Sequence, residues 1–161
     1  MNKIITFSLI GKNSPNFITN VFKNLYLNQV NVLESKIFNF PKNTLISANV
    51  EIYHNINISN IINKYSDFKD LDNTNNHLDK NNCINLFITN ADEPGIIHQT
   101  LEILNDHGLI INKMESYVTT APISSQRVFN MNIEINNSNK KFNFNIISEN
   151  LTKLGSDFQI I

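Results

Sequence analysis

The chain has 161 residues, 41% of them hydrophobic, and a formal net charge of −1 at pH 7. The hydrophobic fraction excludes a chain that is disordered throughout, and the length allows one medium domain or two small ones. The near-neutral charge argues against a protein that binds a nucleic-acid backbone by itself. No apolar run approaches the roughly 18 residues that span a bilayer, and the N-terminal segment lacks the features of a signal peptide. We therefore expect a cytoplasmic protein without a membrane segment.

The first half of the chain predicts a strand, a turn and a helix in succession. Residues 3–10 (KIITFSLI) alternate apolar and polar side chains, which is typical of a strand, and the segment 11–16 (GKNSPN) interrupts this alternation. The next apolar residues recur at the spacing of one helix face, and they are Ile18, Phe22 and Leu25. Two further strands and a second helix are predicted at residues 31–35, 45–53 and 58–65.

The second half repeats this pattern 79 positions later, without a gap across strand, turn and helix. The matched residues are Ile5, Phe7, Leu9, Pro15, Ile18, Phe22 and Leu25 in the first copy and Ile84, Leu86, Ile88, Pro94, Ile97, Leu101 and Leu104 in the second. After a slip of two residues, Asn31–Ser35 aligns with Asn112–Ser116. The third strands align Ala48, Val50 and Ile52 with Phe129, Met131 and Ile133, and both second helices lead into Ser-Asp-Phe, at residues 66–68 and 156–158.

Each half therefore predicts the order β-α-β-β-α-β, the ferredoxin-like arrangement of an antiparallel sheet with two helices on one face. The fold class is α+β, with one unit at residues 1–71, a polar linker at residues 72–82 and a second unit at residues 83–161. Two fused units would pack edge to edge through their sheets or helix face to helix face. The segments Ile4–Ile10 and Ile84–Thr89 carry no charged residue, which favours central or covered strands.

The turn Asp92–Glu93–Pro94–Gly95 is the best candidate for a site in the chain. Proline is preorganised for the first turn of a helix, and glycine lets a ligand approach the backbone closely. The N–H groups at a helix N-terminus also suit a carboxylate. The alternative is structural: Asp92 would only cap the helix, and Gly95 would only satisfy the backbone geometry.

An Asp-x-Pro-Gly turn after the first strand, together with the pair Asn31–Val32 at the start of a second strand, resembles an ACT domain. Two such units in tandem, with a hairpin containing Thr119–Pro122 and Val128–Phe129, resemble the glycine cleavage system transcriptional repressor family. The resemblance implies regulation by a small molecule, commonly an amino acid, held between two units. In such sites the turn of one unit faces the asparagine of its neighbour.

Carried over to this sequence, the resemblance implies two unequal composite sites. The first combines three turn residues of the second half with an asparagine of the first half: Asp92, Pro94, Gly95 and Asn31. The second is degenerate and combines Asn13 and Asn16 with Ile110 or Asn112. We expect only the first to bind a ligand, whereas the alternative treats Asn31 as a plain turn residue.

The resemblance also implies control of transcription without contact to DNA, through a protein partner such as a LysR-type activator of the glycine cleavage operon. Glycine is then the expected ligand, and the chain could form a homodimer. The alternative function is a dimerisation module that binds no ligand. We expect no cofactor.

Enzymatic functions find little support in the sequence. No nucleophile motif, phosphate-binding loop or dinucleotide fingerprint occurs, so we expect no catalytic residues. A ferredoxin-like sheet can stack RNA bases on exposed aromatics, but the strand at residues 45–53 has no central aromatic. An acylphosphatase-like enzyme would need an arginine after the first strand, and Arg127, the only arginine, lies in a later hairpin. We expect Cys83 to be buried and inert, His98 to lie at the surface or half-buried, and no metal site.

Overall fold

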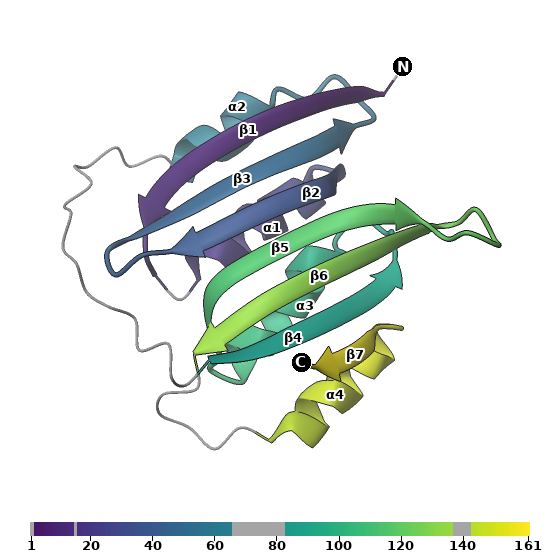
Figure 1. Cartoon of the computed structure of the whole chain (residues 1–161). Coiled ribbons are helices and arrows are strands. Elements are labelled where there is room, and N and C mark those ends of the chain that lie inside the picture. The colour runs from purple at the N-terminus through teal and green to yellow at the C-terminus, as the bar shows by residue number, and fades with distance from the viewer. Residues whose placement is uncertain (1, 15, 66–82, 137–142) are drawn as a thin grey trace.

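The computed structural model describes residues 2–14, 16–65, 83–136 and 143–161. In these ranges the chain forms one seven-stranded antiparallel sheet with helices on one of its faces (Figure 1). The strand order is β1-β3-β2-β5-β6-β4-β7. The predicted α+β fold class is confirmed. No helix within these ranges is long and apolar enough to cross a membrane.

The first unit contains β1 (Lys3–Lys12), α1 (Phe17–Leu27), β2 (Val30–Asn39), β3 (Asn43–Ile52), α2 (Ile58–Ile62) and the short 3-10 helix η1 (Asn63–Tyr65). The second unit contains β4 (Cys83–Ala91), α3 (Ile96–Asp106), β5 (Ile110–Thr120), β6 (Arg127–Asn136), α4 (Phe144–Lys153) and β7 (Asp157–Ile160). The second unit has the complete ferredoxin-like order, and the first has the same order as far as residue 65. Pro15, the expected last strand of the first unit and the linker at 72–82 lie outside the described residues, so the unit boundaries stay a prediction.

The two units join edge to edge, one of the two packings that the sequence left open. Strands β2 and β5 pair antiparallel, from Glu34 opposite Tyr117 to Phe38 opposite Lys113, and lie side by side in Figure 1. Helices α1 and α3, on the face of the sheet that the helices cover, are also in contact with each other. At the junction the buried hydroxyl groups of Ser35 and Ser116 form a hydrogen bond of 2.7 Å. The result is one continuous sheet.

The helix stripes predicted from the sequence form the core between the helices and the sheet. All six predicted positions on α1 and α3 are buried: Ile18, Phe22, Leu25, Ile97, Leu101 and Leu104. Each large apolar side chain removed from water contributes about 1.5–3 kcal/mol. Strand β4 lies between β6 and β7 as expected for a covered strand, whereas β1 is the last strand at its end of the described sheet.

The strand register corrects two details of the predicted repeat. Strands β2 and β5 each contain an irregularity, after Val32 and after Ile111, and these positions are also 79 apart. Asn31 therefore corresponds to Ile110, and the predicted slip that aligned Asn31–Ser35 with Asn112–Ser116 is wrong. The two similar pentapeptides sit at different places in their strands. Asn112 instead occupies the irregularity in β5.

The third strands are also offset from the predicted alignment. Phe7 lies opposite Ala48, and the equivalent Leu86 lies opposite Ile133. Ala48 thus corresponds to Ile133 and not to Phe129. The loop between β5 and β6 is longer than the loop between β2 and β3, and this extra length moves the third strand of the second unit along the sequence. Both alignments have the same alternation, which is why the sequence did not distinguish them.

Candidate functional site

The turn between β4 and α3 is built around Gly95. Gly95 precedes α3 with a φ of 94° in the left-handed region, which residues with a Cβ adopt only with strain. A Cβ at this position would lie 2.6 Å from the ring of Tyr26, which approaches from the other unit. Within the described part of the chain, no side chain caps this helix. Asp92 therefore does not act as a helix cap, and Pro94 lies exposed in the turn before the helix.

Asp92 and Asn31 meet across the boundary between the units, as the predicted composite site requires. Only 3% of the Asp92 side chain is exposed, and Asn31 is also buried. Burial raises the pKa of Asp92, while Arg127 and the nearby Asn31 amide oppose this shift. Oδ1 of Asp92 has no hydrogen-bond partner among the described residues. We call Asp92, Gly95 and Asn31 the Asp92 site.

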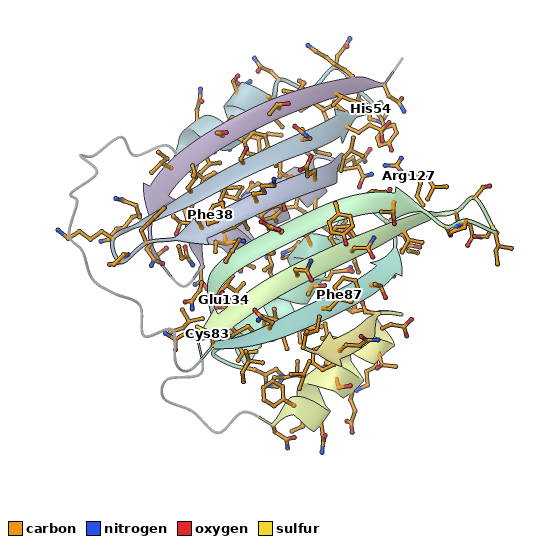
Figure 2. The ribbon with its side chains drawn as sticks, in the orientation of Figure 1. Phe38, His54, Cys83, Phe87, Arg127 and Glu134 are labelled. Atoms are coloured by element: carbon orange, nitrogen blue, oxygen red, sulfur yellow. The ribbon has the colours of Figure 1, made fainter. Side chains whose placement is uncertain are left out.

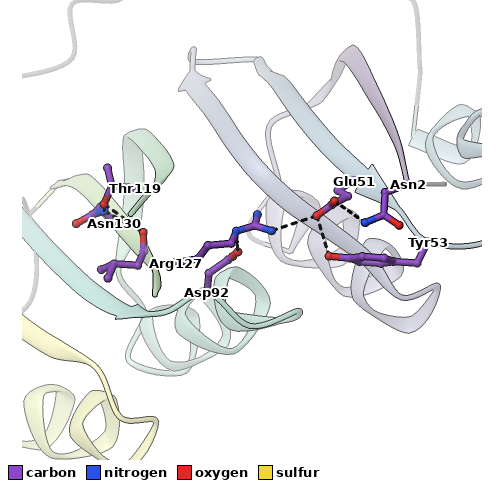
Figure 3. A network of polar contacts seen from close by, with 8 residues as sticks. Asn2, Glu51, Tyr53, Asp92, Thr119, Arg127 and Asn130 are labelled. Atoms are coloured by element: carbon purple, nitrogen blue, oxygen red, sulfur yellow. Dashed lines mark hydrogen bonds and ion pairs between the residues drawn. The ribbon is translucent and has the colours of Figure 1, made fainter. Parts of the chain in front are cut away.

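Arg127 connects the Asp92 site to the first unit (Figure 3). Its Nε lies 2.8 Å from Oδ2 of Asp92, and its Nη1 lies 3.3 Å from Oε2 of Glu51 on β3. Glu51 also accepts hydrogen bonds from the Tyr53 hydroxyl at 2.7 Å and the Asn2 amide at 2.9 Å. The Tyr53 hydrogen bond is the main cause that lowers the pKa of Glu51. Two carboxylates from different units thus share one guanidinium, which Figure 2 shows at the boundary between the two halves of the sheet.

The space beside Asn31 and Gly95 is almost completely filled. A cavity of about 10 Å³ remains there, lined mainly by apolar side chains of both units. Such a volume holds at most one water molecule. The ring of Tyr26 occupies the space, with its centroid 6.0 Å from that of His98. In this conformation the Asp92 site has no room for an amino acid.

His98 is buried, not at the surface or half-buried as expected. Its Nε2 lies 3.7 Å from Glu102, four residues further along α3, and its Nδ1 has no hydrogen-bond partner in the ranges that the structure describes. Burial lowers the pKa of His98, and Glu102 only partly compensates. His98 therefore contributes a neutral, partly unsatisfied ring to the wall of the Asp92 site.

The second composite site, predicted to be degenerate, contains the larger cavity. We call Asn13, Asn16 and Ile110 the Asn13 site. A cavity of about 460 Å³ lies here, with Asn13 and Ile110 in its wall. The Asn13 amide donates a 2.8 Å hydrogen bond to the Phe40 carbonyl, and Asn16 accepts a 2.9 Å hydrogen bond from Asn105 of the other unit.

Asn112 does not belong to this site. Its amide lies 3.3 Å from the sulfur of Cys83 on β4 and 3.4 Å from a carboxylate oxygen of Glu134 on β6. Figure 2 shows Cys83 and Glu134 at the opposite end of the second unit from Arg127. Cys83, expected to be buried, is half-buried, and burial raises the pKa of its thiol.

The two sites differ because equivalent positions carry side chains of different size. Across the 79-residue shift the equivalent pairs are Tyr26 with Asn105, Gly95 with Asn16, and His98 with Thr19. A large ring opposite glycine fills the Asp92 site, whereas two asparagines leave the Asn13 site open. Sequence reasoning missed Tyr26 and Arg127, because neither lies in the turn or at the strand start that define the family motif.

No family model matches the sequence, and no curated protein matches it significantly. Solved structures with a similar fold include an aspartate kinase from Synechocystis, at 12% identity over 98% of this chain and 28% of the kinase, with a TM-score of 0.60. An unknown protein from Galdieria sulphuraria matches at 15% identity over 99% of this chain and 98% of that chain, with a TM-score of 0.39. A candidate glycine cleavage system transcriptional repressor matches at 11% identity over 100% and 98%, with a TM-score of 0.35.

At these identities the comparisons speak to the fold alone. The aspartate kinase likeness supports the architecture of tandem ferredoxin-like units, and the chain spans 28% of that kinase. The other two structures superpose too loosely to carry an argument. Functional conclusions must therefore come from the side chains of the two sites.

Proposed function

We propose that this chain is a regulatory module that binds an amino acid at the Asp92 site and transmits the signal to a protein partner. The observation that carries the proposal is the buried carboxylate of Asp92, which interacts with Asn31 of the other unit and has one oxygen without a hydrogen-bond partner among the described residues. A buried, unpaired carboxylate oxygen is costly unless it gains a partner. An α-ammonium group would supply one.

The remaining groups of an amino acid also find complementary chemistry here. The Ile96 N–H group donates to the Glu93 carbonyl at 3.3 Å, and the N–H groups that follow it at the start of α3 have no carbonyl partner in the helix and favour the α-carboxylate. The Asn31 amide can donate or accept a hydrogen bond, so it suits either charged group of the ligand. Because Asp92 and Asn31 come from different units, ligand binding would also stabilise their contact.

We include in the proposal the finer role that the sequence resemblance implies. The module would repress transcription in the manner of a glycine cleavage system repressor, in the cytoplasm, through a LysR-type activator and without an enzymatic step. Glycine is the first ligand to test, and a homodimer is the expected assembly. The turn at Asp92, Asn31 and the tandem layout support this role, and the net charge of −1 agrees with action through a protein.

The proposal is tested by thermal unfolding with each of the twenty amino acids, followed by titration calorimetry with those that stabilise the protein. A ligand at 100 times its Kd stabilises the folded state by about 2.7 kcal/mol, which raises the Tm of a chain of this size by about 5–10 °C. We expect one binding site per chain. Asn31→Ala should weaken binding about tenfold or more, because it removes a buried hydrogen-bonding group at the ligand.

Asn132→Ala is the matched control, because Asn132 is an exposed asparagine on β6. Two equal binding sites per chain, or an affinity that Asn31→Ala leaves unchanged, would contradict the proposal. The second candidate function, a dimerisation module without a ligand, is favoured by the small volume of the cavity at the Asp92 site. A Tm that no amino acid raises would support that candidate.

A further inference from the structure

We propose that Tyr26 is a plug that occupies the ligand position of the Asp92 site until an amino acid displaces it. This inference rests on the proposed function and adds a mechanism of control to the same site. Two ring atoms of Tyr26 lie within 2.7 Å of the position that a Cβ of Gly95 would take. The ring thus lies directly against the backbone at the turn that would receive the ligand.

The equivalent position of the other unit shows what the site is like without the ring. Asn105 replaces Tyr26 there, and the Asn13 site contains a cavity of about 460 Å³. The cavity at the Asp92 site has about 10 Å³. Both sites use the same elements in the same arrangement, so the aromatic side chain accounts for much of the difference.

Tyr26 is also placed to move. It lies in the last turn of α1, and 39% of its surface is exposed. Within the described ranges, no hydrogen bond holds its hydroxyl group. A rotation of the ring into solvent therefore breaks no polar contact that these ranges contain.

Buried polar atoms near the Tyr26 ring favour its replacement by a polar ligand. His98 is at least nine-tenths buried beside the ring, and its Nδ1 has no partner within the described part of the chain. Oδ1 of Asp92, three residues before Gly95, is also buried and has no partner among the residues that the structure describes. An amino acid that enters in place of the ring would bring a polar group to His98, which lines the cavity. The Tyr26 ring lies tilted against His98, with the ring centroids 6.0 Å apart, and no hydrogen bond joins these two described side chains.

A plug lowers the apparent affinity, because only the fraction of molecules with the ring displaced can bind. Tyr26→Asn copies the residue of the open site and should bind the same amino acid about tenfold more tightly than the wild type. Tyr26→Phe keeps the ring and should bind as the wild type does. Leu27→Asn is the matched control, since Leu27 is the exposed neighbour on the same helix.

The experiment combines calorimetric titration of these variants with the twenty amino acids and proton NMR of Gly95. The ring current of an aromatic ring against the Gly95 backbone displaces its Hα resonances from their ordinary positions. We expect this shift in the wild type and in Tyr26→Phe, its absence in Tyr26→Asn, and its loss when the wild type is saturated with a binding amino acid. Adding Asp92→Asn to Tyr26→Asn should remove the gain in affinity.

The outcomes separate the plug from the proposed function. If the wild type binds as tightly as Tyr26→Asn, or if saturation leaves the Gly95 shift unchanged, the plug is wrong and the proposed function stands. If no amino acid binds either protein, both are wrong. If only Tyr26→Asn binds, the ring closes the site but no amino acid displaces it, so both the plug and the proposed function are wrong for the wild type. The saturation measurement uses the wild type, so it decides the question even if Tyr26→Asn does not fold.

Discussion

Replacing Gly95 by alanine measures the steric cost of the close contact between Tyr26 and the turn. The substitution has two separate costs. The left-handed backbone at Gly95 costs a residue with a Cβ about 1–2 kcal/mol. The new Cβ would also lie 2.6 Å from the Tyr26 ring, and such overpacking costs about 1–3 kcal/mol. We therefore expect Gly95→Ala to lower the free energy of unfolding by about 2–5 kcal/mol.

Gly155 offers a matched control for the backbone cost alone. Its φ of 74° is also left-handed, but the nearest atom to its added Cβ is Oδ1 of Asn90 at 4.0 Å, an ordinary contact. Gly155→Ala should therefore cost only about 1–2 kcal/mol. Urea unfolding with linear extrapolation measures both variants, and unchanged m-values would show that the unfolded state is comparable.

The same substitution in a Tyr26→Asn background separates the cost of the contact with the ring from the backbone cost. In a Tyr26→Asn background the ring is absent, so Gly95→Ala should cost no more than Gly155→Ala. Equal losses for the two glycine variants in the wild-type background would refute the reasoning, because they would show that Tyr26 imposes nothing on the turn.

Three further predictions concern buried polar groups. Arg127→Gln removes the cation from the buried Asp92 carboxylate and should cost about 1–3 kcal/mol in urea unfolding, with a smaller cost in an Asp92→Asn background; equal costs would contradict the ion pair. Ser35→Ala should cost about 1–2 kcal/mol by leaving the Ser116 hydroxyl unpaired, and Ser35→Ala with Ser116→Ala should cost less than the sum of the two single changes. Burial lowers the pKa of His98 from its ordinary value of 6.5, so the unfolded chain binds a proton there that the folded chain does not. The free energy of unfolding should therefore rise as the pH increases up to about 6.5, and the rise should be shallower in His98→Gln; an identical slope would exclude His98 as its source.

The elements near the site could be predicted because their signals are local. The alternation of β4, the break at Pro94 and Gly95, and the spacing of Ile97, Leu101 and Leu104 each depend on a few neighbouring residues. The repeat then placed the same elements in the first unit. Only the sequence resemblance suggested that Asn31 would face Asp92, and the structure brings the two together.

The remaining features depend on how the units approach each other. Tyr26 follows the last residue of the apolar stripe on α1, and no local pattern indicates that its ring reaches Gly95 of the other unit. Arg127 meets Glu51 only because β2 and β5 join the two sheets. The misaligned Asn112 shows the opposite case, in which a local similarity conceals an irregularity in the strand.

Because both units belong to one chain, the two sites at their shared boundary are encoded by different codons. In a symmetric dimer of a single unit, each substitution would appear twice, and an aromatic residue that closes one site would close the other. Here the positions of Tyr26 and Asn105 can change independently. The pairing of β2 with β5 therefore allows one boundary between units to become a closed, charged site while its counterpart stays open and neutral.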